Sequence, residues 1–242
     1  MADPTGTIPR ILHQIWIGPH AQPVVWTDTF ERDYMAQNPE YEYILWTEKN
    51  IGELFADFPV SRVVYDNEPT YNGKSDILRY LILYKYGGIY VDADSVWVNH
   101  KSFDPLIEGT NSTGVFVSVH PRESDGMCGG VMGATPGNPL IKLLITEIEK
   151  YVLRGEIVAP IDYVRRTRVH GASFNVGPAH IHRHFTGKGV TVFPSVYFYP
   201  VSWHGKRDVD AHTSMEMPSE SFTYQYGYST NNMEDAIASA NT

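Results

Sequence analysis

The sequence predicts an α/β protein, folded as a single domain with a mostly parallel central sheet flanked by helices. Strand-forming and helical segments alternate along the first hundred residues, and this order places parallel strands in one sheet. The segment Asn72 to Tyr86 has a clear helical pattern, and a short buried strand follows it directly. The length of 242 residues is that of one large domain.

Near the N-terminus, strand-forming residues run from Ile8 to Gly18 and end at Gly-Pro, which predicts a first buried strand. Val24 to Gln37 is expected to be helical and to stop before Asn38-Pro39. Tyr41 to Trp46 is expected to be a second strand, and a short helix should follow around Glu48 to Phe55.

The helix expected from Asn72 to Tyr86 carries a wide apolar stripe that includes Ile77, Leu78 and Leu81. Gly87 supplies the left-handed residue that ends such a helix. Gly88 to Asp92 is then a short strand that leads into two carboxylates.

The second half contains weaker signals. Val115 to Val119 reads as a strand, and Asn138-Pro139 begins a helix that extends to about Leu153. Two further strands are expected at Val190 to Phe193 and at Val196 to Phe198. From about Met217 the polar composition predicts a loop that closes over the site. We therefore expect one domain over residues 1–230 and a flexible tail over residues 231–242.

Composition indicates which binding partners and which cellular location to expect. The formal net charge is -9 and no basic stripe offsets it, so a nucleic-acid partner is not expected. No apolar segment reaches the ~20 residues that span a bilayer, and none resembles a signal peptide, which predicts a cytoplasmic protein. The single cysteine, Cys128, excludes an intrachain disulfide and is expected to be a buried, inert thiol.

Asp92 and Asp94 carry the strongest chemical signal. They stand two residues apart at a strand end, so both carboxylates point to one side. Two close carboxylates repel each other unless a cation lies between them. Oxygen ligands favour Mn²⁺ or Mg²⁺ over Zn²⁺, and such ions leave coordination sites for substrate phosphates.

Asp76 and Arg79 share one face of the helix that precedes this strand. A local ion pair worth a few tenths of a kcal/mol would explain them. In the functional interpretation, Arg79 neutralises phosphate and Asp76 accepts hydrogen bonds from sugar hydroxyls. Open α/β sheets bind ligands at the carboxyl ends of their strands, where these residues would lie.

Several sequence blocks together resemble a known family. They are Ile8-Pro9-Arg10-Ile11-Leu12-His13-Gln14-Ile15-Trp16-Ile17-Gly18, Asn38-Pro39 with Trp46, Ser75-Asp76-x-x-Arg79, and Tyr86-Gly87-Gly88-Ile89-Tyr90-x-Asp92-x-Asp94. This ordered set looks like the glycosyltransferases with the DXD sugar-binding motif, the Och1-like and capsular-polysaccharide group (glycosyltransferase family 32-like). That group is distantly related to the clostridial glucosylating toxins. The match covers roughly residues 8 to 100.

The resemblance implies a GT-A fold, a nucleotide-sugar donor, Mn²⁺ or Mg²⁺ as cofactor, retention of anomeric configuration and a role in polysaccharide biosynthesis. The catalytic residues by resemblance are Asp92, Asp94 and Arg79. The substrate-binding residues are Trp16 for the base, Ile17 beside it in sequence, Asp76 and Arg79 for the donor sugar and phosphate, and Asp92 for ribose and sugar. By this resemblance Asp94 is the direct metal ligand, with Asp92 beside it.

The chain also departs from the family pattern. Cys128-Gly129-Gly130 stands where family members often carry an asparagine. The family's C-terminal metal ligand and Ser-Trp element are not recognisable, although Ser229 is expected to keep the phosphate contact. The candidates for a third metal ligand are His204 and His212.

The expected reaction moves a hexose from a nucleotide sugar to a glycan or another hydroxyl acceptor. UDP-sugars are favoured by the Trp16 block, and GDP-mannose is a second candidate. The alternatives are a metal-dependent phosphohydrolase, a glycoside hydrolase and a non-catalytic sugar-binding protein. His180, His182 and His184 recur at strand spacing and could suggest zinc, but a polar strand or helix start is the preferred interpretation.

Overall fold

A six-stranded mixed sheet forms the centre of the protein. The computed structural model describes residues 6–120, 126–153, 175–202 and 208–241. In spatial order the strands are β2 (Glu42–Trp46), β1 (Ile11–Ile15), β3 (Gly88–Val91), β6 (Met127–Ala134), β5 (Val115–Val119) and β7 (Thr191–Phe193). β6 is antiparallel to both of its neighbours, and the other pairs are parallel. The predicted mostly parallel sheet is confirmed.

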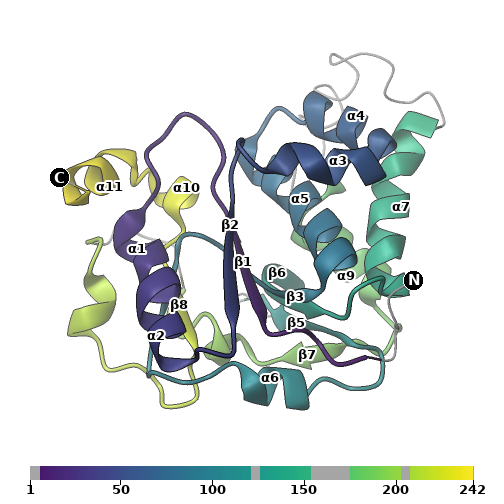
Figure 1. Ribbon diagram of the computed structural model, residues 1–242. Helices are drawn as coiled ribbons and strands as arrows, with labels where there is room; N and C mark the ends of the chain where they lie inside the picture. The colour runs from purple at the N-terminus through teal and green to yellow at the C-terminus, as the bar shows by residue number, and fades with distance from the viewer. Residues whose placement is uncertain (1–5, 121–125, 154–174, 203–207, 242) are drawn as a thin grey trace.

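Helices cover both faces of this sheet, which Figure 1 shows nearly edge-on. One face carries α3 (Leu54–Asp57), α4 (Pro59–Asn67), α5 (Tyr71–Tyr86), α7 (Pro139–Leu153) and α9 (Pro178–Phe185). The other side carries α1 (Val24–Asp28), the π-helix η1 (Thr29–Tyr34), α2 (Met35–Gln37), α10 (Tyr228–Asn231) and α11 (Glu234–Ala240). A small antiparallel sheet of β4 (Ser95–Trp97) and β8 (Thr223–Gln225) lies on that second side.

Alternate strand residues supply the core on the two faces. Tyr90, Val115 and Val117 pack with the buried residues of α5, α7 and α9. Ile89 and Phe116 point to the opposite face and pack in a second cluster. Because both faces of the sheet are covered, these strands read as nearly continuous apolar runs in the sequence.

Helix α5 brings its first two turns to the edge of the sheet. The Thr70 side chain accepts a hydrogen bond from the backbone N–H of Gly73 and caps the helix. Gly87, with φ of 68°, ends it and leads directly into β3. The predicted helix and its glycine stop are confirmed, and the short connection fixes α5 beside β3.

The helical segment predicted from Val24 to Gln37 is present as α1, η1 and α2 in succession. The short helix expected after β2 begins later, with the 3-10 turn η2 (Ile51–Glu53) and α3. Helix α4 was not predicted. Two further short helical segments are α6 (Asp104–Glu108) and the 3-10 helix η5 (Ala211–Ser214).

Two sequence predictions about the second half differ from the structure. The strand expected at Val196 to Phe198 is wrong, because Ser195–Tyr197 forms the 3-10 turn η4, in which the Tyr197 N–H bonds to the Pro194 carbonyl. The segment after Met217 contains β8 and α10 rather than loop alone. Helix α11 follows, and its Ile237 is buried, so a helix occupies most of the expected tail.

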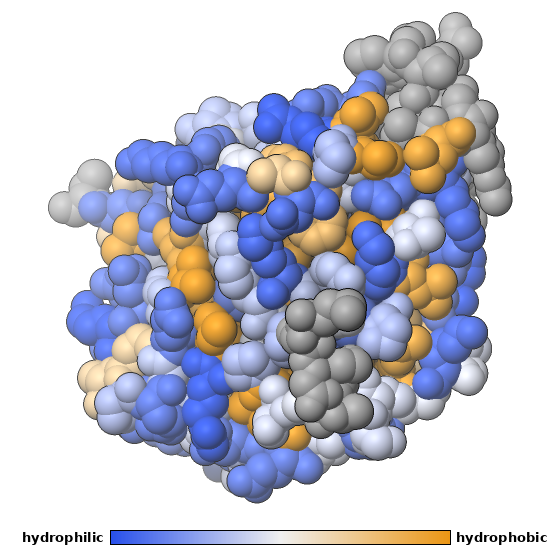
Figure 2. Space-filling model, turned by 45° about the vertical axis from the view of Figure 1, so that its right-hand side comes forward, coloured by the Kyte–Doolittle hydropathy of each residue, from blue (hydrophilic) through white to orange (hydrophobic). Residues whose placement is uncertain are grey.

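The described residues on the face shown in Figure 2 are mostly polar, and their apolar side chains lie in small, separate patches. Among the residues that the structure describes, no helix combines the length and the apolar character needed to cross a membrane.

Candidate active site

A pocket of about 450 Å³ opens at the carboxyl ends of β1 and β3. This edge of an α/β sheet is the usual place for a ligand. Four segments contribute to the pocket: the ends of these strands, the first turns of α5 and the C-terminal segment from β8 to α10. The predicted residues Trp16, Ile17, Asp76, Arg79, Asp92, Asp94 and Ser229 all line it. The structure therefore brings together nearly the whole predicted set.

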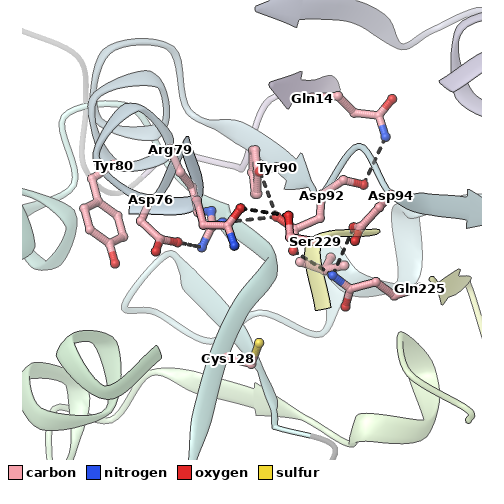
Figure 3. A network of polar contacts seen from close by, with 12 residues as sticks. Gln14, Asp76, Arg79, Tyr80, Tyr90, Asp92, Asp94, Cys128, Gln225 and Ser229 are labelled. Carbon is pink, nitrogen blue, oxygen red and sulfur yellow. Dashed lines mark hydrogen bonds and ion pairs between the residues drawn. The ribbon is translucent and has the colours of Figure 1, made fainter. Parts of the chain in front are cut away.

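Arg79 lies at the centre of the polar network in Figure 3. Its Nη1 forms an ion pair with Asp76 Oδ1 at 2.9 Å, and its Nη2 reaches Asp92 Oδ1 at 3.1 Å. The guanidinium also stacks 4.4 Å from the ring centre of Tyr90, whose hydroxyl donates to Asp92 Oδ1 at 2.8 Å. The ion pair within α5 is thus present, but Arg79 also connects the helix to the end of β3.

Gln225, from β8, connects the two aspartates of the DXD motif. Its Nε2 donates to Asp92 Oδ2 at 2.9 Å and to Asp94 Oδ1 at 3.1 Å. The backbone N–H of Tyr228 donates to Asp94 Oδ2 at 2.8 Å. The Asp92 carbonyl accepts from Gln14 Nε2 at 3.2 Å, so β1 also holds this turn. The acidic pair is fixed from both the N-terminal and the C-terminal parts of the chain.

Burial raises the pKa of the three aspartic acids in the pocket. The pKa of Asp94 rises to about 6 because of burial and the charge of Asp92. Burial raises the pKa of Asp76 to about 7, although the Arg79 charge opposes the shift. Burial also raises the pKa of Asp92, against the same arginine. One guanidinium therefore does not compensate for three buried carboxyl groups, and a divalent cation would supply the missing charge.

The oxygen atoms of Asp92 and Asp94 fit a hard divalent cation, since both side chains lie within hydrogen-bonding distance of one nitrogen of Gln225. No group of three or more His, Cys, Asp or Glu side chains that could hold a metal occurs in the part of the chain that the structure describes. In these described residues, no third His, Cys, Asp or Glu therefore joins Asp92 and Asp94 as a metal ligand.

Of the two histidines considered as a third ligand, His212 lies within the described residues. His204 lies outside the described residues. His212 lines a separate groove with Trp97 and Asn99, and its Nδ1 is hydrogen-bonded to the Tyr226 hydroxyl. The structure therefore places His212 away from the DXD pocket.

Glycines of β6 form the wall behind the network. A Cβ atom on Gly130 would lie 2.7 Å from Asp92 Oδ2, and one on Gly129 would lie 2.7 Å from Arg79 Nη1. Real Cβ contacts are not that short. The glycines that depart from the family pattern here therefore leave the space that the Asp92 and Arg79 side chains occupy. The neighbouring Cys128 is buried, as predicted, and burial raises the pKa of its thiol to about 11.

Aromatic side chains surround the pocket mouth. The Trp16 indole packs edge-on against Tyr228, with ring centres 5.1 Å apart, and donates its N–H to the His20 carbonyl at 3.0 Å. Tyr71, which is 49% exposed, lies against Gly18. Neither Tyr71 nor Gln225 stands out in the sequence, because each is an ordinary aromatic or polar residue until the fold brings it to the pocket.

Ser229 links the C-terminal segment to the start of α5. Its hydroxyl donates to Asn72 Oδ1 at 3.1 Å. The predicted closing segment thus reaches across the mouth of the pocket, with Ser229 exposed to a ligand.

The histidine series takes a different conformation from a strand. His180, His182 and His184 lie on helix α9, in accordance with the preferred interpretation as a helix start. His180 is buried, and its Nε2 is 3.1 Å from the Leu144 carbonyl. Its ring packs against that of His184, one helical turn away.

The fold and the pocket define a class: an α/β protein with an acidic, cation-compatible site at the carboxyl edge of a mostly parallel sheet. Residues 23–113 match the family described as "Glycosyltransferase sugar-binding region containing DXD motif". The resemblance seen in the sequence is confirmed, because this region is similar to the sugar-binding region of the DXD-containing glycosyltransferases.

Two curated relatives are similar in sequence. "Inositol phosphoceramide mannosyltransferase 3" of Schizosaccharomyces pombe is 32% identical over 148 residues, which make up 61% of this chain and 39% of that protein. "Initiation-specific alpha-1,6-mannosyltransferase" of Candida albicans is 24% identical over 223 residues, 78% of this chain and 55% of that protein. The chain therefore spans between about two fifths and about half of the length of these relatives.

A solved structure shows the same fold. The structure titled "PaToxG Glycosyltransferase" superposes with a TM-score of 0.54 at 19% identity, over 97% of this chain and 88% of that chain. At this identity the similarity concerns the fold alone, and the expected GT-A fold is confirmed.

Proposed function

We propose that this protein is a metal-dependent glycosyltransferase that moves a hexose from a nucleotide sugar to a hydroxyl acceptor. The observation that supports the proposal is the linked set of Arg79, Asp92 and Asp94 in a pocket at the carboxyl edge of the sheet. A guanidinium and a cation-compatible acid pair in one partly enclosed pocket suit a diphosphate ligand.

Mannose is the proposed sugar. The names of the two curated relatives both specify mannosyl transfer, whereas they differ in the acceptor or linkage that they indicate. This agreement moves the preference from UDP-sugars to GDP-mannose as the first donor to test. The acceptor is proposed only as a glycan or another hydroxyl compound.

Each side chain has a proposed role in donor binding. Arg79 and Ser229 contact the diphosphate, and Asp76 accepts hydrogen bonds from sugar hydroxyls. Trp16 and Ile17 contact the base, and Asp92 contacts ribose and sugar. Asp92 and Asp94 would hold Mn²⁺ or Mg²⁺, which would stabilise the charge on the departing nucleoside diphosphate.

The test is donor turnover by the purified protein with MnCl₂ and GDP-mannose, and in parallel with UDP-glucose and UDP-galactose. Because the acceptor is not identified, transfer to water is measured as released sugar and nucleoside diphosphate. Asp92→Ala and Asp94→Ala should each abolish turnover while the circular dichroism spectrum stays unchanged. Asp66→Ala, at an exposed ion pair on α4, is the matched control and should keep full turnover.

The products separate this proposal from its rivals. Release of inorganic phosphate would indicate a phosphohydrolase, and donor binding without turnover would indicate a sugar-binding protein. Near-normal turnover by Asp94→Ala would contradict the metal assignment.

Retention of configuration is proposed from the family resemblance. Proton NMR of the first sugar released or transferred should show the anomer of the donor. Appearance of the opposite anomer first would contradict retention.

A further inference from the structure

The Gln225 carboxamide has one end with two partners and one end with none. Its Nε2 donates to both Asp92 and Asp94, whereas its Oε1 is buried and has no hydrogen-bond partner in the described structure. The residue is only 7% exposed. A buried acceptor without a partner is costly, and each such group in a protein calls for an explanation.

The two ends of a carboxamide have nearly the same shape, so a half-turn about the Cγ–Cδ bond exchanges oxygen for nitrogen. Between two carboxylates without a cation, the NH₂ end is favoured because it donates to both. With a divalent cation beside Asp92 and Asp94, the oxygen end is favoured because it supplies electron density to the ion. Amide oxygens are ordinary ligands for hard cations.

The other described groups around Asp92 and Asp94 do not offer a free oxygen ligand in the way that Gln225 does. Gln14, the other glutamine at this turn, has both ends engaged, with Nε2 on the Asp92 carbonyl and Oε1 on the Tyr43 hydroxyl. Tyr228 offers Asp94 only a backbone N–H donor. Within the described ranges no third His, Cys, Asp or Glu completes a metal group.

We propose that Gln225 is a protein ligand of the divalent cation, and that its side chain turns Oε1 toward Asp92 and Asp94 when the ion binds. This inference rests on the proposed function, because the cation is part of that function. In this arrangement the neutral amide of Gln225, from β8, is the third protein ligand beside the two aspartates that follow β3.

The test is Mn²⁺ binding to the metal-free protein without nucleotide, measured by the electron paramagnetic resonance signal of free Mn²⁺. Gln225→Met removes the amide but keeps the length of the side chain. It should raise the Kd for Mn²⁺ on the order of tenfold, the scale typical of lost support at metal sites. Gln37→Met, a matched change at an exposed residue of α2, should leave the Kd unchanged.

If Gln225→Met does not fold, a second variant still tests whether Gln225 is a metal ligand. Gln225→Glu replaces the neutral oxygen with an anionic one and should lower the Kd for Mn²⁺. The decrease must exceed that of Asn72→Asp, which adds the same charge at the pocket mouth. An equal decrease in both variants would overturn the proposal, because it would reflect charge alone.

The outcomes also separate this inference from the proposed function. If Gln225→Met binds Mn²⁺ as tightly as the wild type or more tightly, the amide is only a hydrogen-bond donor and the inference fails. If the wild type binds Mn²⁺ and Asp94→Ala does not, the metal part of the proposed function stands even then. If the wild type binds no Mn²⁺, both fail.

Discussion

Asp94 should make the stability of the metal-free protein depend on pH in an unusual direction. Its pKa is about 6 in the fold, against about 3.9 for an aspartate in an unfolded chain. Between these values the folded state binds the proton more strongly, so protonation stabilises the fold. Stability should therefore fall as the pH rises from about 4 to about 6, and then level off.

The measurement is urea unfolding at several pH values for the wild type and for Asp94→Asn, in the presence of a chelator. The difference in the free energy of unfolding, wild type minus variant, should fall by about 1 to 3 kcal/mol over that range. Titrating groups that do not interact with Asp94 cancel in the difference. A difference that stays flat or rises with pH would contradict the raised pKa.

At the residue scale, the sequence predicted charged groups better than neutral ones. Asp76, Arg79, Asp92 and Asp94 lie close together in the chain, and their charges already suggest a diphosphate and a cation. Gln225 is more than a hundred residues away and carries no charge. Only the pairing of β4 with β8 brings it to the acid pair.

At the scale of elements, a substitution on β6 can show how closely this strand approaches the carboxylate of Asp92. Gly130→Ala would place a Cβ 2.7 Å from Asp92 Oδ2 and 2.6 Å from the Tyr199 hydroxyl. Overpacking of this kind should lower the free energy of unfolding by about 1–3 kcal/mol and weaken Mn²⁺ binding through the displaced carboxylate. Chemical denaturation and the Mn²⁺ titration measure the two effects.

Gly52→Ala is the matched control for this change. Nothing lies within 4 Å of a Cβ at Gly52, so its stability should be unchanged or slightly raised. If the two alanine variants had equal stability and equal Mn²⁺ affinity, the close approach of β6 to Asp92 would be wrong.

The cap of α5 gives a second prediction at this scale. Thr70→Ala removes the acceptor for the Gly73 N–H and should cost about 1 kcal/mol in the free energy of unfolding. Thr70→Ser keeps the hydroxyl and should retain most of the stability. Equal losses in both variants, measured by urea denaturation, would mean that the methyl group rather than the cap matters.

Element predictions from sequence succeeded where local signals agreed with the fold. The α5 pattern, its glycine stop and the following strand all pointed to one structure. Strand β6 was missed because Gly129, Gly130 and Gly133 weaken any strand signal. Those glycines are present because side chains approach too closely for a Cβ, which is a tertiary requirement that the local sequence does not reveal.

At the scale of the whole molecule, ligand binding should stabilise the fold most when metal and nucleotide are both present. At a ligand concentration of about 100 times Kd, the gain is about 2.7 kcal/mol, or about 5–10 °C in Tm for a chain of this size. A thermal-shift screen with Mn²⁺, GDP-mannose and UDP-sugars measures it. A shift that persists in Asp94→Ala would contradict the joint site.

The pairing of β4 with β8 also has a consequence for biosynthesis. Trp97 leaves the ribosome early, and its partner Thr223 is added about 6 to 25 s later at ordinary translation rates. A nascent chain that stops between residues 194 and 222 already contains every strand of the six-stranded sheet, yet lacks Gln225, Tyr228 and Ser229. The segment that completes the pocket is therefore synthesised after all the strands of the six-stranded sheet, and a product terminated in that interval would lack it.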